Sequence, residues 1–459
     1  MTALLLAAPV VHARTHGTGG TELASAFDKD DPWDFHVSLG YSRRLKRGSV
    51  VRQLVGRDIT QANVENVKEL RYSQTTHKLN VRAEFGVFWD LQLHIEFPII
   101  LSDNRVLSFA QNGGSSCGTP ASTNCVTPRN STTVRDGFVN GGAMAPDQIA
   151  VAGSQGAPGG RVLPIRSGLD QINFGLTWAV LNQKRDDTKP TWVIGFEARL
   201  AAGSTMRYDP ANPQANTAVG RGLHQMHWWT AVAKRFPYID AWIGFHYLMP
   251  IERDDSLFHE TDFPGSGQER HEPRHIGWLE AGLEVIPWED KKQQHKFTIE
   301  IGGRLEGIFE GRGYSPIWEL LAGQPNLART CLDSSIWNNG TYCKAAGDVI
   351  PYPGITRIEN HLNFFGSLAL NLQVTKYFQA RLMFAIGHEQ DHDITFADAG
   401  RAICNPSNPS SRGCQGELDV NDPVQVNPMY RPLVDTNGRR YRVAEATVFD
   451  IAFSLKALF

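Results

Sequence analysis

The sequence predicts an all-β fold, a transmembrane antiparallel up-and-down β-barrel of about twelve strands. Three observations predict it. Segments of roughly ten residues alternate between apolar and polar side chains, which places the two kinds on opposite faces of a strand. The connections between these segments are alternately short and long. No apolar run approaches the roughly 18–20 residues that a membrane-spanning helix needs.

A predicted hairpin over 77–87 and 91–102 shows the alternation most clearly. Leu93 belongs to an apolar row, whereas His94 and Glu96 belong to the opposite, polar row. A soluble sandwich would bury the apolar row and expose the polar row to water. A membrane barrel would turn the apolar row to lipid and the charges to a lumen. The hairpin alone is compatible with both.

The other strands follow from the same test, taken in chain order. The predicted strands are Trp33–Tyr41, 77–87, 91–102, 171–181, 191–201, 222–235, 239–250, 275–286, 295–309, 360–373, 378–387 and 442–459. Their apolar rows run from Phe35 to Tyr41, Leu79 to Val87, Leu91 to Leu101, Ile172 to Val180, Trp192 to Leu200, Ile239 to Tyr247, Leu279 to Val285, Phe297 to Leu305, Leu362 to Leu372, Phe378 to Ile386 and Phe449 to Phe459. Only the strand at 222–235, which contains Trp228 and Trp229 side by side, has ambiguous facing.

The connections decide between sandwich and barrel. Every second connection is a few residues long, and the others are long loops, at about 42–76, 103–168, 203–221, 251–274, 310–359 and 388–440. A sandwich has variable loops at both ends, whereas membrane barrels have short periplasmic turns and long extracellular loops. Aromatic residues also crowd the short turns, as expected for an interfacial girdle. The pattern therefore favours the barrel, with both termini on the short-turn side.

The residues before the first strand suggest export. Met1–Ala13 resembles the back half of a secretory signal peptide whose basic beginning is missing, which points to a translation start assigned too late. The alternative is a buried N-terminal strand or helix. We expect 14–32 to form a polar periplasmic tail and 33–459 to form the barrel.

The cysteines also indicate an oxidising compartment. They fall into three sequence-local pairs, each within a long loop, namely Cys117 with Cys125, Cys331 with Cys343, and Cys404 with Cys414. None of the pairs has the Cys-x-x-Cys spacing of a zinc site. We predict three disulfides, with free thiols as the alternative.

Two resemblances support this interpretation. The last strand ends in Phe459 and resembles the C-terminal assembly signal of bacterial outer-membrane β-barrel proteins. That resemblance implies a Gram-negative outer-membrane location, recognition by the barrel-assembly machinery, and contact with lipid and lipopolysaccharide. Ser167–Asp170 and Ala202–Ser204, which bracket a strand–turn–strand unit, are similar to a pattern in transporter-type barrels of the phenol-degradation MetA-like family, as is the hairpin at 85–93. This likeness implies transport, although Ala202 stands where that family has Pro.

Inward-facing charges are the main functional prediction. The candidates for lumen selectivity are Arg82, Glu84, His94, Glu96, Glu197, Arg199, Asp240, Glu280, Glu284, Glu300, Arg304, Glu306, Arg381, Asp450 and Lys456, and His36 and His246 share the same face. They would form either a charge ladder in a narrow pore or an ion-pair network that plugs the barrel. The excess of acids over bases favours cationic or polar neutral solutes.

These residues predict a porin-like channel for small polar or weakly cationic solutes. A plugged structural or adhesin-type barrel that binds partners through its disulfide-linked loops is the alternative. A lipid hydrolase is a third hypothesis, and it would need an outward Ser beside an outward His. We predict no catalytic residue and no cofactor. The net charge of −3 argues against nucleic acid as a partner.

Metal binding is only weakly indicated by the sequence. The candidates are His388, Asp391, His392 and Asp393 at the outer end of a strand, where carboxylates and imidazoles alternate. A solvated acidic loop explains the same residues, and we therefore predict no metal site. A second group, comprising His224, His227, His259, His271 and His275, is interpreted as scattered loop histidines.

Overall fold

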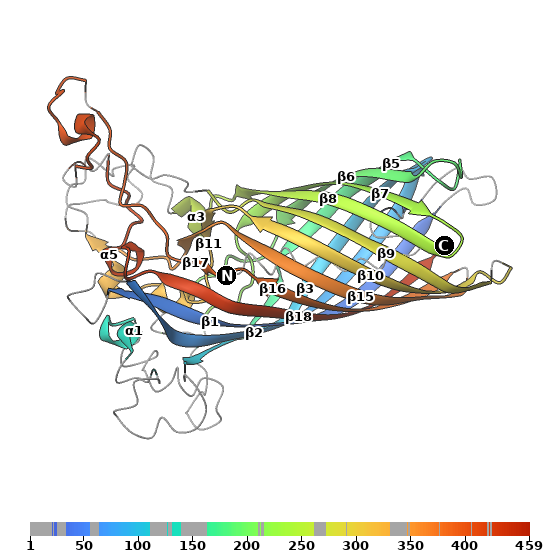
Figure 1. Cartoon of the computed structure of the whole chain (residues 1–459), viewed down its shortest axis with the longest axis horizontal. Helices are drawn as coiled ribbons and strands as arrows, with labels where there is room; N and C mark the ends of the chain where they lie inside the picture. The colour runs from blue at the N-terminus through green and yellow to red at the C-terminus, as the bar shows by residue number, and fades with distance from the viewer. Residues whose placement is uncertain are drawn as a thin grey trace.

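Twelve long strands pair in sequence order and close into a barrel, seen from the side in Figure 1. The computed structural model describes residues 21, 23–24, 34–55, 64–110, 126, 131–138, 163–209, 212, 215–260, 272–290, 292–330, 347, 349–375, 377–404, 406–419, 422 and 425–459. The wall strands are β1 (Phe35–Val55), β2 (Val64–Phe88), β3 (Leu91–Phe109), β5 (Gln171–Leu181), β6 (Thr191–Ala201), β7 (Leu223–Arg235), β8 (Ile239–Glu252), β9 (Ile276–Asp290), β10 (His295–Ile308), β15 (His361–Thr375), β16 (Phe378–Glu389) and β18 (Tyr441–Leu458). The predicted closed barrel of about twelve strands is confirmed.

Pairing of the first and last strands closes the sheet. β1 and β18 are antiparallel from His36 opposite Leu458 to Arg52 opposite Tyr441. At the short-turn end, the amides of Phe35 and Phe459 each donate a hydrogen bond to the other's carbonyl, at 3.0 and 2.9 Å. Closure leaves no wall strand with an unpaired edge, which is the condition for placing a sheet in lipid.

The strands near the chain's beginning are longer than the sequence indicated. Most of the loop expected at 42–76 is strand, because β1 and β2 stay paired as far as Val55 opposite Val64. β3 likewise continues to Phe109, inside the loop expected at 103–168. The apolar alternation stops earlier because Arg43 and Arg47 are exposed on the outer face while Arg44 is buried on the inner face. Backbone pairing therefore continues where the outer face becomes charged, and the side-chain pattern no longer reports it.

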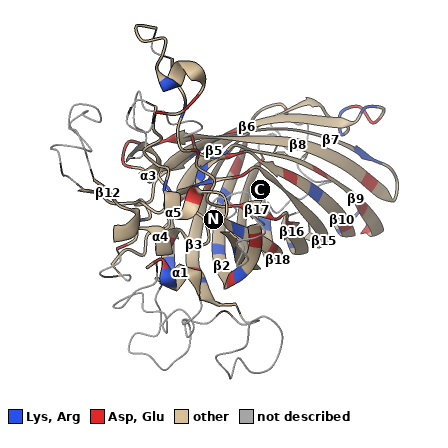
Figure 2. Ribbon diagram, turned by 60° about the vertical axis from the view of Figure 1, so that its left-hand side comes forward, with Lys and Arg blue, Asp and Glu red and all other residues tan. Residues whose placement is uncertain are grey.

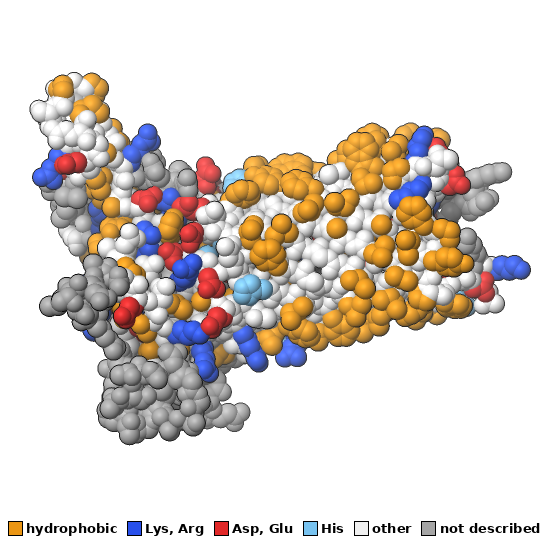
Figure 3. Space-filling view, viewed as in Figure 1, with side chains coloured by type: hydrophobic (Ala, Val, Ile, Leu, Met, Phe, Trp, Pro, Cys, Tyr) orange, Lys and Arg blue, Asp and Glu red, His pale blue; other side chains and the backbone are white. Residues whose placement is uncertain are grey.

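The outer surface of the barrel is apolar over its middle. Figure 3 shows hydrophobic side chains covering the wall, while charges gather toward the end that carries the long loops. Leu93, Phe245 and Ile386, all from predicted apolar rows, are exposed. Aromatic side chains are exposed at the short-turn end, including Phe88, Trp89, Phe236, Tyr238, Trp288, Tyr377 and Phe378. The arrangement matches the lipid-facing band and interfacial aromatic girdle of membrane barrels.

Short elements fill the long connections and pack over the outer mouth of the barrel (Figure 1). They are α1 (Thr132–Arg135), β4 (Arg166–Leu169), α3 (Leu257–Glu260), β11 (Gly311–Gly313), α4 (Trp318–Leu321), the 3-10 turn Pro325–Leu327, β12 (Arg329–Thr330), β13 (Val349–Ile350), β14 (Thr356–Ile358), β17 (His392–Asp393), the 3-10 turn Arg412–Gln415 and α5 (Pro432–Asp435). Within the described ranges, no helix is both long enough and apolar enough to cross a membrane.

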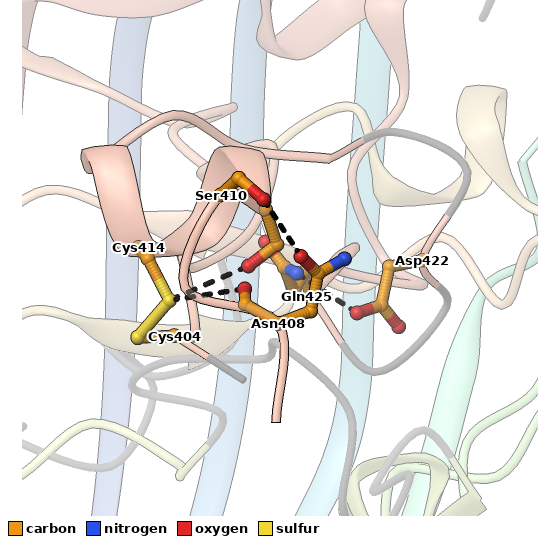
Figure 4. The surroundings of a disulfide bond; sticks show 7 residues. Cys404, Asn408, Ser410, Cys414, Asp422 and Gln425 are labelled. Carbon is orange, nitrogen blue, oxygen red and sulfur yellow. Dashed lines mark hydrogen bonds between the residues drawn. A yellow bond between two sulfur atoms is a disulfide. The ribbon is translucent and has the colours of Figure 1, made fainter. Parts of the chain in front are cut away.

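One predicted disulfide lies within the described residues. Cys404 and Cys414 are bonded in the loop that follows β17 (Figure 4), which confirms that pair. Nearby, Ser410 Oγ donates to Asn408 Oδ1 at 3.0 Å, and Gln425 Nε2 donates to Asp422 Oδ2 at 2.8 Å. The other four cysteines, Cys117, Cys125, Cys331 and Cys343, lie outside the described residues, as does Met1–Ala13, so those predictions stand untested.

The exposed position of Phe245, six residues into β8, gives a direct test of its facing. We expect Phe245→Arg to lower the free energy of folding into lipid vesicles by about 2–4 kcal/mol, because the charge would lie near mid-bilayer. Phe88→Arg, at the aromatic rim, is the matched control and should cost only about 0–1 kcal/mol. Urea titration of folding in vesicles measures both. Equal losses for the two variants would contradict the assigned membrane position.

Candidate functional site

The interior of the barrel is the candidate site, because it gathers almost all of the predicted charges. The structure buries each of the fifteen predicted side chains, and none of them is more than 9% exposed. They are Arg82, Glu84, His94, Glu96, Glu197, Arg199, Asp240, Glu280, Glu284, Glu300, Arg304, Glu306, Arg381, Asp450 and Lys456. Figure 2 shows acidic and basic positions along the strands from one end of the barrel to the other. Their effect on selectivity stays a prediction.

The Glu197 carboxylate on β6 is the centre of this network. One oxygen accepts from Arg199 Nε at 2.7 Å, and the other lies 2.9 Å from His94 Nε2. His227 Nδ1 and Arg82 Nη1 complete the surroundings at 3.7 and 3.9 Å. A carboxylate that is only 2% exposed needs such partners, because an uncompensated buried charge is costly.

Two glycines let these side chains cross neighbouring strands. His94 on β3 reaches Glu197 on β6 by lying over β5, where a Cβ on Gly175 would come within 2.4 Å of the imidazole. Trp229 on β7 similarly lies over Gly195 of β6, where an added Cβ would be 1.9 Å from the indole. Both positions have room for no side chain at all. Glycine in these strands thus serves the interior network.

The network continues toward β1 and β18 through Glu84. Arg82 Nε donates to Glu84 Oε1 at 2.7 Å, and Arg82 Nη1 lies 3.3 Å from Glu96 Oε2. Lys456 Nζ on β18 is 2.8 Å from Glu84 Oε2, and His36 Nδ1 on β1 is 3.4 Å from the same oxygen. The ion pairs therefore span the seam where the barrel closes.

In the other direction the network passes through stacked rings. His227 Nε2 lies 3.1 Å from His246 Nδ1, and His246 Nε2 lies 3.1 Å from Glu280 Oε1. Trp278 stacks on His246, with centroids 4.6 Å apart and planes inclined by 6°. The Arg304 guanidinium lies over the Trp278 ring, 5.0 Å from its centroid. The histidines predicted as scattered loop residues thus include one, His227, that belongs to the interior.

Separate ion pairs occupy the rest of the wall. Arg381 Nη1 donates to Glu300 Oε2 at 2.7 Å, and Lys296 Nζ donates to Glu284 Oε1 at 3.3 Å. Further pairs are Arg304 with Glu306 and a bidentate contact of Arg44 with Asp450 at 2.6 and 2.7 Å.

Several interior charges were missed by the sequence analysis. Arg44, Lys46, Asp103 and Arg105 are buried, and all four lie in the strand extensions that had been assigned to loops. Lys296 was inside a predicted strand, in the same inward row as Thr298 and Glu300, and alternation alone could have found it. Because four of these five side chains are basic, the excess of interior acids on which the preference for cations was based largely disappears.

Residues from before the first strand also lie inside the barrel. Leu23 packs against Ala179, Val193 and Ala231, which are inward positions of β5, β6 and β7. The Ala24 amide donates to Gln92 Oε1 at 2.5 Å. Leu23 thus finds small apolar side chains on the inner wall near the short-turn end. Only residues 21, 23 and 24 of the segment 14–32 are described, so its periplasmic location stays a prediction.

The outer mouth is covered by residues of the long loops. Glu319 of α4 is 1% exposed and lies between two arginines, with Oε1 2.8 Å from Arg166 Nη2 and Oε2 3.8 Å from Arg105 Nη1. Trp318 beside it packs in an apolar cluster. The cluster also contains Met206, Leu223, Leu257, Phe258, Tyr314, Ala322 and Ile355. Two charged contacts and two apolar clusters, the second of which contains Leu320 and Leu321, thus hold α4 over the polar interior.

The weak metal candidates separate onto different faces. His388 and Asp391 are exposed, whereas His392 and Asp393 are buried. Arg440 Nη1 lies 4.0 Å from Asp393 Oδ2, and the Asp393 amide donates to Glu359 Oε2. The four residues were candidates together because they are close in sequence, but their side chains do not converge on one point. His392 instead meets His361 and Glu389.

The chain has no match among family models and none among curated proteins. Among solved structures it is similar to an outer membrane channel from Pseudomonas putida F1, at 9% identity over 92% of this chain and 95% of that chain, with a TM-score of 0.38. A FadL homologue from Pseudomonas aeruginosa matches at 9% identity over 93% and 90%, with a TM-score of 0.30. The outer membrane protease OmpT from Escherichia coli matches at 8% over 93% and 96%, with a TM-score of 0.25. At such scores the likenesses carry no functional argument, and the fold rests on the strand pairing of this chain.

The central carboxylate should be essential to stability. We expect Glu197→Gln to reduce the free energy of unfolding by about 3–5 kcal/mol, because it leaves buried cations without their counter-charge. Glu445→Gln is the control: Glu445 pairs with Lys68 on the exposed surface, and its loss should change stability by less than about 1 kcal/mol. Urea unfolding in vesicles reports both. A loss below about 1 kcal/mol for Glu197→Gln would show that water screens the network.

The loop elements over the outer mouth, here called the loop cap, should respond to pH through Asp435 of α5. Its carboxylate accepts from the amides of Arg431 and Ala397, at 2.8 and 3.2 Å, but burial raises the pKa of Asp435 to about 7 from its ordinary 3.8. A raised pKa means that the folded cap is most stable when the carboxyl is protonated. The contribution of Asp435 to the stability of the cap is complete below about pH 4, and it is lost as the pH rises through about 7.

Hydrogen exchange of the α5 amides measures this effect. After correction for intrinsic rates, protection should be greater at pH 5 than at pH 8 in the wild type and nearly pH-independent in Asp435→Asn. An unchanged pH dependence in the variant would assign the effect to another group.

Proposed function

We propose that the protein is a non-enzymatic outer-membrane channel for small polar solutes, and that the structure corresponds to its closed state. The observation that carries the proposal is the relation between wall and contents. The inner wall is lined with charged and polar side chains along its length, and segments that are not part of the wall lie against it near both ends. In this proposal lipid and lipopolysaccharide surround the apolar belt, and Phe459 is read by the assembly machinery.

The two closing segments differ from the wall in how they are held. The wall side chains are anchored to strands that are hydrogen-bonded on both sides. Leu23 and Ala24, near the short-turn end, contact the wall through one small apolar cluster and one amide hydrogen bond. Glu319, near the outer mouth, pairs with Arg166 and Arg105, and Trp318 beside it adds apolar packing. Withdrawal of either segment would leave the barrel sheet intact, which supports gating rather than permanent closure.

The solute class follows from the balance of charge. Interior acids such as Glu197 and Glu284 are matched by bases such as Arg199 and Lys296, so the lumen carries no strong excess of either sign. Alternating donors and acceptors at close spacing favour polar solutes that can exchange hydrogen bonds with both. We therefore propose that the solutes are polar and neutral or zwitterionic, and that the channel has little preference for cations.

A plugged structural or adhesin-type barrel is the second candidate. Burial of the interior charges favours it, as does the disulfide-linked loop of Cys404 and Cys414, which extends away from the barrel in Figure 1. Such a loop offers a constrained surface for a partner. The two candidates differ in one property, which is whether ions ever cross.

Single-channel recording in planar bilayers tests the proposal. Wild-type protein should be closed most of the time with brief openings. Glu319→Gln should raise the open probability about tenfold or more, since loss of about 1.4 kcal/mol from the closed state gives that factor. Glu445→Gln, on the outer surface, is the matched control and should behave as wild type. Absence of any conductance from wild type and Glu319→Gln at all voltages would contradict the channel and favour the plugged barrel.

A further inference from the structure

Three side chains converge at the outer end of the barrel, apart from the lumen network. His361 is the first residue of β15, Glu389 is the last residue of β16, and His392 lies in the short strand β17. Strand pairing brings them together, since Asn363 lies opposite Glu389 and Val443 of β18 lies opposite His392. All three are buried, at 4%, 1% and 1% exposure. Burial at a rim that faces water calls for a reason.

Their remaining polar atoms lie close together. His361 Nε2 and His392 Nε2 lie 3.9 and 3.7 Å from Glu389 Oε1, and the two imidazoles stack with centroids 3.5 Å apart and planes inclined by 6°. Among the described residues, none of these three atoms has a hydrogen-bond partner. The distances are too long for hydrogen bonds between them. Three unsatisfied buried atoms in one place carry a substantial desolvation cost.

The opposite ring atoms define which tautomer is present. His361 Nδ1 lies 2.9 Å from the Glu359 carbonyl oxygen, and His392 Nδ1 lies 2.9 Å from the Gln390 carbonyl oxygen. A carbonyl can only accept, so both Nδ1 atoms carry the proton and donate. Both Nε2 atoms of the neutral rings therefore carry lone pairs, and together with Glu389 Oε1 they place three acceptor atoms within 4.8 Å of one another. A hydrogen-bond donor or a cation would satisfy all three.

We propose that His361, Glu389 and His392 bind a divalent transition-metal ion of the zinc class. Two imidazole nitrogens and one carboxylate oxygen form a donor set that suits zinc and related metals better than calcium or magnesium. Bonds of about 2.0–2.2 Å in tetrahedral geometry put ligand atoms roughly 3.3–3.5 Å apart. The two Nε2–Oε1 separations, 3.9 and 3.7 Å, are somewhat longer than this, and the two stacked rings must also tilt toward a common point for their in-plane lone pairs to bind one ion. The fourth position is left for water or another ligand.

The surroundings have the features of a prepared metal site. Donation from Nδ1 to a backbone carbonyl is the usual way in which proteins orient a metal-binding histidine and increase its basicity. The other carboxylate oxygen of Glu389 accepts from Lys46 Nζ, which fixes the rotamer and leaves Oε1 directed at the imidazoles. The groups that orient the ligands are themselves fixed. The two carbonyls belong to the backbone of Glu359 and Gln390, and Lys46 lies on strand β1.

The position of the site indicates a structural role. His361 and Glu389 belong to the barrel wall, whereas His392 begins the long connection that carries Cys404–Cys414 and α5. A metal ion bound by all three would fasten this connection to the mouth of the barrel. The inference is independent of the proposed channel activity, because a plugged barrel would use the same site in the same way.

Metal content and spectroscopy test the proposal on the full-length, untagged chain folded in detergent. After treatment with a chelator, the protein is dialysed against micromolar Zn²⁺, and bound metal is measured by mass spectrometry. The wild type should retain about one zinc per chain, and X-ray absorption should show imidazole nitrogens together with oxygen at about 2.0–2.2 Å. The double variant His361→Gln/His392→Gln should lose at least about nine-tenths of the metal, as expected when two of three ligands are removed.

His388→Gln is the matched control, since His388 precedes Glu389 on the same strand but is exposed on the outer face. It should bind zinc as the wild type does. Heat-modifiable migration on gels reports whether each variant is folded. Zinc retention by the folded double variant, or a wild type that takes up no stoichiometric zinc, would overturn the proposal. If the double variant fails to fold, the wild-type absorption spectrum decides alone, and an absence of imidazole ligands would overturn it.

Discussion

Closure of the sheet between β1 and β18 is the constraint on which the rest of the structure depends. Lipid offers no hydrogen bonds, so every wall strand requires a neighbour on each side. The reciprocal amide bonds of Phe35 and Phe459 mark one end of that seam, and Arg52 opposite Tyr441 marks the other. Once the sheet is closed, strand alternation commits half of the side chains to a small enclosed volume. Charged side chains on that face therefore need partners on other strands, because an unpaired buried charge is costly.

The interior shows how those partners are found. Glu197 accepts from its own strand through Arg199 and from β3 through His94, because Gly175 on the strand between them leaves room for the imidazole. Such contacts rigidify the wall, yet they leave it polar. The segments inside the wall are not part of the sheet: Leu23 lies in one small cluster, and α4 is held by the pairing of Glu319 with two arginines and by apolar packing of Trp318. A rigid polar wall with contents that are separate from the sheet is the physical basis of the proposed gating.

The sequence predicted most of the fold because lipid imposes a strict two-residue period. All twelve wall strands and the direction of Glu84, Glu197 and Lys456 followed from that period alone. The outer extensions of β1, β2 and β3 did not, because Arg43 and Arg47 face water outside the lipid and the period disappears there. The charges carried by those extensions, including Lys46 and Arg105, were lost with them.

Which inward residues contact one another could not be predicted from alternation. The contact of Arg82 with Glu197 joins β2 to β6, so it depends on the curvature of the wall and on side-chain reach. The convergence of His361 with Glu389 depends on the pairing of β15 with β16. In the sequence, adjacency pointed to His392, which belongs to the site, but also to His388 and Asp391, which are exposed. Glu389 itself continues the inward row of Arg381 and could have been found.

The unequal strand lengths have a geometric consequence for the rim. β1 has 21 residues and β6 has 11. At about 3.3 Å per residue and a tilt near 45°, these correspond to heights of roughly 50 and 25 Å. The outer rim of the barrel is therefore oblique. It is high at β1, β2 and β18 and low at β5 to β7 (Figure 1). The loops that cover the outer mouth therefore start from different heights around the rim.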